Sequence, residues 1–330
     1  MQYNKNLIWR ALRLGAGAFA LFFLLTSCSE TEKSTPTAAE PATTSPVITI
    51  GLVMKTLTNP FFIEMERGAR RAEKEYGIHL LVKTAAQETS IQQQIGIVED
   101  LISRKVDAIV IAPGDSIELI PVLKQAQDAG IVVINIDNPL SPEYSSKVGL
   151  KTVPFISVDN ELAAYQSAST LTRLMQQPTE VAIVEGIRGA QNAEDRKKGA
   201  IRAFNEHPLA RLVASQSANW KIDEGYAVTE QLLHAHPNIG AIFCANDMMA
   251  LGAIKYLQTA DMKHVLVAGY DALEPAKQAI LHGSLVATVD QQAAEQGYQG
   301  ILFAVRALRG ETLAPVTLIE TRILTRLELN

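Results

Sequence analysis

Polar and aromatic residues follow directly after a series of short apolar stretches, and their types indicate what chemistry they could do. Amide and charged side chains donate and accept hydrogen bonds in fixed directions, while Phe and Trp faces pack on the C–H faces of a sugar-like ring. Such a set suits a neutral ligand that is rich in hydroxyl groups. The candidate residues are Lys55, Asn59, Phe61, Phe62, Asp137, Asn138, Arg196, Trp220, Asn246, Asp271 and Gln291.

Each candidate also has a purely structural interpretation. Asn59 could simply cap a helix, and Phe62 continues an apolar helix stripe. Arg196 lies among other charged residues and could be one more solvated charge. Asp137 could cap a helix, Asp271 could form a turn and Trp220 could pack in a core. Asp247, which follows Asn246, could also cap a helix. Their shared position after apolar stretches is what favours a binding site.

The sequence carries none of the motifs that would indicate a common enzyme class. The sequence lacks the nucleophile elbow G-x-S-x-G and the phosphate-binding loop G-x-x-x-x-G-K. It also lacks the dinucleotide-binding pattern G-x-G-x-x-G after the first strand. Of the six histidines only His234 and His236 are close, and residues two apart on a helix point to different sides. Asp137 and Asp271 would meet at the site without a nucleophile or leaving group, which fits hydroxyl recognition. We therefore expect no enzyme, no metal site and no cofactor.

Composition bounds the architecture and the partners. The chain has 330 residues, is 47% hydrophobic and carries a net charge of -5, which suits one or two globular domains. The acidic balance argues against a nucleic-acid partner. The two cysteines, Cys28 and Cys244, cannot form a disulfide framework. Cys244 lies in an apolar strand, where a reduced thiol behaves as a small hydrophobe.

Apolar stretches alternate with helical patterns along most of the chain. Residues 47–54 are typical of a strand buried on both faces, and an amphipathic helix follows, with Asn59 and Pro60 at its start. Strand-helix alternation predicts parallel sheets with ligand-binding edges at the carboxyl ends of the strands. Two series of similar plan predict two lobes with a crevice between them. The further strands are expected near 78–83, 107–112 and 131–136, and, after a polar break at 138–154, near 181–185, 211–216, 239–244, 264–269 and 285–289.

The first 46 residues differ from the rest. Residues 1–27 contain three basic residues, then a short apolar core, and LTSC ends at Cys28. This pattern is typical of an export signal, and LTSC resembles the lipobox in which the cysteine is lipidated after cleavage. Residues 28–46 are rich in Ser, Thr, Pro, Ala and Glu, so we expect a disordered tether. An ordinary cleaved signal with a chance cysteine is the alternative.

Four segments in order carry a resemblance to a known family. They are NPFF at 59–62, NDMMALGA at 246–253, VAGYD ending at Asp271 and VATVDQ ending at Gln291. Together they resemble the periplasmic sugar-binding proteins of the ribose-binding type. The resemblance runs from about Val47 to the end of the chain, and it implies an α/β fold of two Rossmann-like lobes with parallel sheets joined by a three-strand hinge.

The resemblance also implies how the chain divides and which residues touch the sugar. The N-terminal lobe would comprise 47–158 plus 292–317, and the C-terminal lobe 159–291 plus 318–330, with crossovers near Asp159, Gln291 and Thr317. By the resemblance the ligand contacts would be Asn59, Phe61, Phe62, Asp137, Arg196, Trp220, Asn246, Asp271 and Gln291. Lys55 and Asn138 are expected to line the same site, and three of these positions depart from the ribose pattern. Lys55 replaces a small hydroxyl residue, Asn138 an arginine and Trp220 a phenylalanine. Another pentose, a furanose hexose or a sugar alcohol therefore fits as well as ribose.

The leading hypothesis is a solute-binding lipoprotein of an ABC transporter, monomeric and anchored through Cys28 in the periplasm or at the cell surface. It would capture a monosaccharide or polyol and deliver it to a membrane permease by hinge closure. An alternative keeps the fold but makes the closed protein a signal for a membrane sensor or chemoreceptor. A sugar-responsive transcription regulator would need a helix-turn-helix ahead of the first strand, where this sequence has a signal and a tether.

Overall fold

The computed structural model describes residues 47–330. The predicted signal peptide (1–27), Cys28 and the tether (28–46) lie outside these described residues. Within the described part of the chain, no helix is long and apolar enough to cross a membrane.

The chain opens with the predicted strand, loop and helix. Strand β1 (Thr49–Met54) is buried along almost its whole length, because it lies inside a parallel sheet that is covered on both faces. Helix α1 (Pro60–Tyr76) begins where expected: the Asn59 side chain accepts a hydrogen bond from the Phe61 amide, and Pro60 occupies the first turn. The side chains of Phe62 and Met65 then pack into the core. The loop between β1 and α1, residues 55–59, is therefore held at the carboxyl end of β1.

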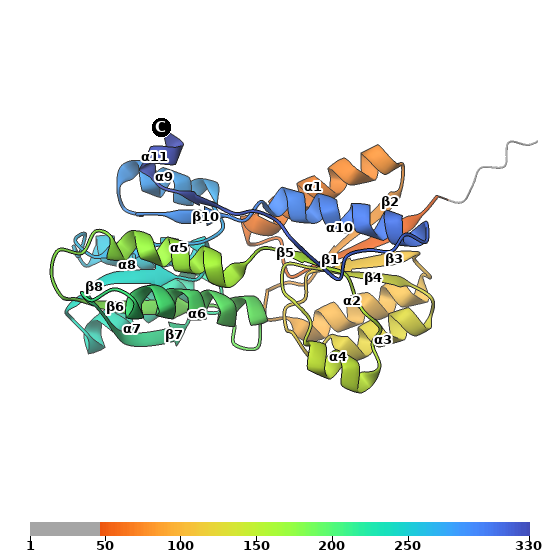
Figure 1. Cartoon of the computed structure of the whole chain (residues 1–330), viewed down its shortest axis with the longest axis horizontal. Coiled ribbons are helices and arrows are strands. Elements are labelled where there is room, and N and C mark those ends of the chain that lie inside the picture. Colours follow the sequence, from red (N-terminus) through yellow and green to blue (C-terminus); the bar gives the residue numbers. More distant parts are fainter. Residues whose placement is uncertain (1–46) are drawn as a thin grey trace, which may run out of the picture. The chain divides into compact units, whose positions relative to one another are not determined.

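The first sheet is entirely parallel, as the alternating pattern predicted. Its strand order is β11-β5-β4-β3-β1-β2. In Figure 1, helices α1 and α10 run along one face, and α2 and α3 cover the other. The remaining strands are β2 (His79–Thr84), β3 (Ala108–Ile111), β4 (Val132–Ile136), β5 (Phe155–Ser157) and β11 (Val316–Leu318), and the helices are α2 (Ile91–Ser103), α3 (Ile120–Asp128), α4 (Pro142–Val148) and α10 (Ala293–Leu308).

Helix α4 is a difference from the sequence-based expectation, which had only a polar break at 138–154. Ser141 caps the helix by accepting a hydrogen bond from the Tyr144 amide, Pro142 occupies the first turn, and Gly149 ends it with a φ of 73°. Proline and glycine therefore act here as start and stop signals of a short helix. In the sequence they resembled interruptions.

The second sheet repeats the plan of the first with the order β7-β6-β8-β9, again all parallel. Helix α5 packs on α6, and α7 packs on α8. These elements are β6 (Thr179–Glu185), β7 (Ala210–Ser217), β8 (Ile239–Cys244) and β9 (Leu266–Ala268), with α5 (Asn160–Thr172), α6 (Gln191–Asn205), α7 (Ile222–Ala235), α8 (Asp247–Thr259) and α9 (Glu274–His282). The two sheets form the two lobes expected from the two series of strands.

The chain passes between the lobes at three places. It leaves β5 for α5, returns from β10 (Thr288–Asp290) into α10, and passes from β11 to β12 (Arg322–Leu324). Strands β10 and β12 pair antiparallel, and β11 pairs with β5. These paired passages form the three-strand hinge, and a short helix, α11 (Arg326–Leu329), ends the chain. The residues at which one lobe ends and the other begins stay a prediction.

Candidate functional site

Every predicted ligand contact except Asn138 lines one small cavity between the two lobes. Its volume is about 10 Å³, roughly the minimum that holds one water molecule, so a sugar enters only if the lobes or side chains move. Two residues that were not predicted, Glu88 and Asn192, complete the lining. The full lining is Lys55, Asn59, Phe61, Phe62, Glu88, Asp137, Asn192, Arg196, Trp220, Asn246, Asp271 and Gln291.

A buried ion pair forms one wall of the cavity. Lys55 follows β1 and Asp137 follows β4, and Lys55 Nζ lies 2.7 Å from Asp137 Oδ2. Both side chains are only 3% exposed. Asp137 has a φ of 67°, a left-handed conformation that turns its carboxylate toward Lys55 and toward the other lobe. The pair thus presents one cation and one acceptor at the carboxyl edge of the first sheet.

Asn59 has two roles at once. Its Oδ1 caps α1, while its Nδ2 donates to Glu88 Oε1 at 3.0 Å. Burial raises the pKa of the Glu88 carboxyl to about 6, although the ammonium of Lys55 and the hydrogen bond from Asn59 favour the charged form. The helix-cap interpretation of Asn59 is therefore correct and compatible with its place in the cavity wall.

Arg196 lies at the centre of the opposite wall, which the C-terminal lobe supplies. Its guanidinium donates to Asn160 Oδ1 at 2.8 Å, to the Ala245 carbonyl at 2.9 Å and to Gln291 Oε1 at 3.3 Å. It also stacks on the Tyr270 ring at 3.8 Å from the centroid. The side chain is 4% exposed, so Arg196 is not a solvated surface charge. A planar fork held this way is suited to oxygen acceptors.

Asp271 and Gln291 join Arg196 in one network. Gln291 Nε2 donates to Asp271 Oδ1 at 2.7 Å, and Arg196 Nη1 lies 3.5 Å from the same oxygen. Burial raises the pKa of the Asp271 carboxyl well above its usual range, against the opposing effect of the Arg196 charge. Asp271 has a φ of 120°, so its backbone is strained in the loop after β9. In this conformation the side chains of Arg196, Asp271 and Gln291 are paired with one another at the cavity wall.

Aromatic rings close the cavity from both lobes. Phe61 and Phe62 meet edge to face with centroids 5.1 Å apart, and Trp220 lines the same cavity from the loop after β7. A Cβ at Gly186 would lie 2.1 Å from the Trp220 ring, so glycine is required there. The Asn246 side chain donates to the Trp220 carbonyl at 3.2 Å and also caps α8. Within residues 47–330, no group hydrogen-bonds Trp220 Nε1.

Asn138 differs from the other candidates because it does not line the cavity. It is fully buried, and its Nδ2 donates to the Pro113 carbonyl and to Ser116 Oγ, each at 3.2 Å. Its Oδ1 accepts from the Asn192 backbone amide at 3.1 Å. The residue therefore joins the two lobes beside the cavity.

Other groups that could do chemistry have structural partners. Asp247 is fully buried, accepts from the Thr288 hydroxyl and from the Leu273 amide, and fixes the loop that carries Asp271. Burial raises the pKa of the Cys244 thiol, which keeps it protonated inside β8. Among residues 47–330, no cluster of three or more His, Cys, Asp or Glu side chains could hold a metal ion.

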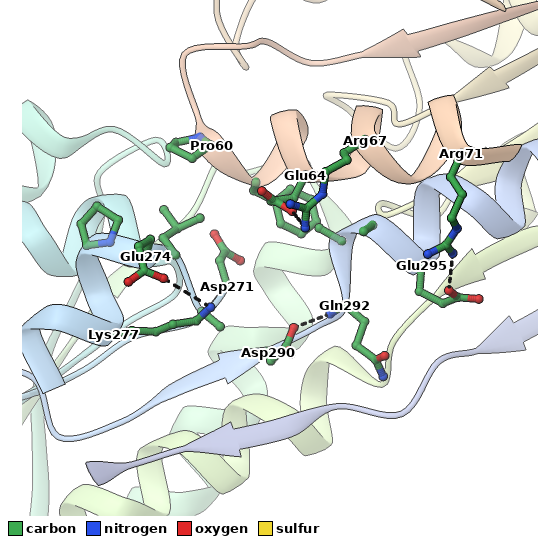
Figure 2. Close-up of a pocket in the computed structure, with 16 residues that line it drawn as sticks. Pro60, Glu64, Arg67, Arg71, Asp271, Glu274, Lys277, Asp290, Gln292 and Glu295 are labelled. Carbon is green, nitrogen blue, oxygen red and sulfur yellow. Dashed lines mark hydrogen bonds and ion pairs between the residues drawn. The ribbon is translucent and has the colours of Figure 1, made fainter. Parts of the chain in front are cut away.

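A larger pocket of about 540 Å³ borders the small cavity and shares Phe61 and Asp271 with it. Figure 2 shows the start of α1 on one side and the start of α9 on the other, with Asp290 and Gln292 at the crossover between them. Its walls carry many charges that pair locally, such as Arg71 with Glu295 at 3.1 Å. The pocket thus has a solvated, charged lining, whereas the small cavity has buried polar groups and aromatic faces.

Comparisons with known proteins agree with this architecture. The family described as "Periplasmic binding protein domain" matches residues 50–312. A D-ribose/D-allose-binding protein of Pseudomonas aeruginosa is 40% identical over 294 residues, which cover 88% of this chain and 90% of that protein. The ribose import binding protein of Escherichia coli is 32% identical over 263 residues, which cover 80% of this chain and 86% of that protein.

A solved structure shows the same fold. The ABC transporter periplasmic solute-binding protein from Actinobacillus succinogenes 130z, solved with bound D-allose, superposes with a TM-score of 0.81 at 38% identity. The match covers 86% of this chain and 99% of that one. The family and these relatives bind solutes and are not enzymes, which agrees with the missing enzyme motifs, and membership implies export to the periplasm. With the two lobes, the three crossovers and the family match in agreement, the chain belongs to the periplasmic sugar-binding proteins of the ribose-binding type that serve ABC importers.

Proposed function

We propose that this protein captures a monosaccharide or polyol in the small cavity between its lobes and delivers it to a membrane permease. The observation that carries the proposal is the lining of that cavity: buried donors and acceptors from both lobes beside three aromatic rings. Burial of a polyol requires partners for nearly all its hydroxyl groups, because each unpaired group costs about 1 to 3 kcal/mol. Lys55, Asp137, Arg196 and Asp271 now pair with one another and would exchange these partners for ligand hydroxyls.

D-allose and D-ribose are the first ligands to test, because they are the sugars named for the relatives described above. Other pentoses, furanose hexoses and sugar alcohols follow. Lys55 adds a buried cation that can donate to a ligand hydroxyl, and Trp220 offers a larger ring face than phenylalanine. Both features give the ligand contacts that differ from those of the ribose pattern.

The site would work by closure of the lobes. In an open form each lobe carries half of the contacts, so the ligand binds best to the closed form and shifts the population toward it. Cys28, if lipidated, would keep the mature protein at the membrane as a monomer near its permease. The same closed form could signal to a membrane sensor. Uptake of radiolabelled sugar by cells with and without the protein separates these two roles.

A thermal-shift screen of monosaccharides and sugar alcohols tests the binding function. A ligand that binds only the folded protein at one hundred times its Kd stabilises it by about 2.7 kcal/mol, so the melting temperature rises. The matched control is Asp271→Asn, which keeps the shape of the side chain but cannot ionise and replaces one acceptor oxygen with a donor. We expect one sugar to stabilise the wild type and to lose most of that effect in the variant. A screen in which no sugar or polyol shifts the wild type would contradict the proposal.

A further inference from the structure

The first turn of helix α6 has no cap of its own. Ala190 occupies the position before the helix, and its side chain cannot accept a hydrogen bond. The first amides of a helix need acceptors from elsewhere, and Ser or Asn side chains usually supply them. Here the acceptors come from the other lobe: the Gln191 amide donates to Ser116 Oγ at 3.0 Å, and the Asn192 amide donates to Asn138 Oδ1 at 3.1 Å.

The two capping side chains are fixed within their own lobe. Ser116 lies in the loop after β3 and Asn138 in the loop after β4, and Asn138 Nδ2 donates to Ser116 Oγ at 3.2 Å. The Ser116 amide also donates to the Gly189 carbonyl across the interface at 3.2 Å. Both residues are buried, so the first lobe presents a preformed acceptor site to α6.

Asn192 connects this contact to the ligand cavity. Its Nδ2 donates to Asp137 Oδ1 at 3.4 Å, and Asp137 is paired with Lys55. Asn192 lines the cavity, and within residues 47–330 no donor reaches its buried Oδ1. A buried acceptor without a donor is costly, and a ligand hydroxyl placed beside it would satisfy it. The same helix turn therefore touches the other lobe with its backbone and the cavity with a side chain.

We infer that the first turn of α6 is a closure latch: Ser116 and Asn138 cap it across the lobes, and Asn192 is the positioning residue that couples the latch to a ligand hydroxyl. When the lobes separate, the α6 amides exchange these caps for water. The latch thus favours the closed form. Asn138, which stands where the ribose-type pattern has an arginine, acts here on closure and not on the sugar directly. The inference rests on the proposed sugar-binding function.

A matched pair of serine substitutions tests the latch. Ser116→Ala removes a cap that acts between lobes, whereas Ser141→Ala removes the cap of α4, which lies within one lobe. Loss of a serine cap corresponds to about a two- to thirtyfold change in an equilibrium constant. We expect Ser116→Ala to weaken sugar binding by that factor in calorimetry and to increase the radius of gyration of the unligated protein in X-ray scattering. Ser141→Ala should lower the melting temperature but leave both quantities unchanged.

Hydrogen exchange on the wild-type protein gives a readout that needs no variant. We expect the amides of Gln191 and Asn192 to exchange more slowly when sugar is bound, because closure adds their caps. Unchanged exchange at both amides with bound sugar, or equal affinity and scattering in the two serine variants, would overturn the latch. If no sugar binds the wild type, the proposed function fails. The radius of gyration of unligated wild type and Ser116→Ala still tests whether the latch holds the lobes closed.

Discussion

Replacing Glu88 by glutamine should change how the stability of this protein depends on pH. Glu88 lies in the cavity wall, accepts a hydrogen bond from Asn59 and is 9% exposed. Burial raises the pKa of its carboxyl from the ordinary 4.5 to about 6, which means that the folded protein holds this proton more tightly than the unfolded chain. Glutamine has the same shape and resembles the protonated carboxyl, but it cannot ionise.

The sign and size of the effect follow from proton linkage. Because the folded pKa is raised, the stabilising contribution of protonated Glu88 is fully present below pH 4.5 and is lost as the pH rises through 6. A shift from 4.5 to about 6 corresponds to about 2 kcal/mol, since one pKa unit is worth about 1.4 kcal/mol. The wild type should therefore lose about 2 kcal/mol relative to Glu88→Gln between pH 4 and pH 7.

The assay is urea unfolding of both unligated proteins at several pH values from 4 to 7.5, with the free energy of unfolding compared at each pH. The matched control is Glu99→Gln, the same change at an exposed position of α2, where substitutions usually alter stability by less than about 0.5 kcal/mol. We expect the difference between wild type and Glu88→Gln to grow with pH, and that for Glu99→Gln to stay small. If the difference in unfolding free energy between wild type and Glu88→Gln does not change with pH, the assigned burial of this carboxyl is refuted.

Three further predictions concern the site and the anchor. Arg196→Ala and Asp271→Ala should each weaken sugar binding by a few kcal/mol, about a hundredfold or more in Kd. Each change leaves buried polar groups without a hydrogen-bond partner. Retained affinity in calorimetry would count against the site. Trp9 lies in the predicted signal, so Trp220 should be the sole tryptophan of the mature protein, and its fluorescence should change on binding; an unaltered emission at saturation would remove it from the site. Cys28→Ala should move the protein from the membrane fraction to the soluble fraction on immunoblots, and an unaltered distribution would refute lipid anchoring.

The sequence predicted the architecture well because the fold depends on patterns that are local. Continuous apolar runs marked the buried parallel strands, and the loops after them marked one edge of each sheet. From the position of these residues after predicted strands we expected Asn59, Asp137 and Asp271 to lie together, and all three line the same cavity. The role of these residues in ligand binding stays a prediction, as does the exact residue at which each lobe ends.

Three features of the site were not predicted from the sequence, each for a physical reason. Glu88 follows β2 and obeys the same strand-end rule, but its loop carries no motif that draws attention to it. Asn192 lies one helical turn before Arg196, so the helix period could have placed both on one face. Asn138 adjoins Asp137, and only the left-handed backbone at Asp137 shows that the two side chains point to different surroundings. Aspartate adopts this conformation more readily than most residues, but tertiary contacts decide whether it does so at a given position.

The central claim is that a sugar binds between the lobes with contacts from both. A crystal structure of the protein with the sugar identified by thermal shift tests it most directly. We predict electron density for the sugar within hydrogen-bonding distance of Asn59, Arg196 and Asp271, with the small cavity enlarged around it. Density in the charged pocket beside α9, or on the surface of a single lobe, would contradict the account.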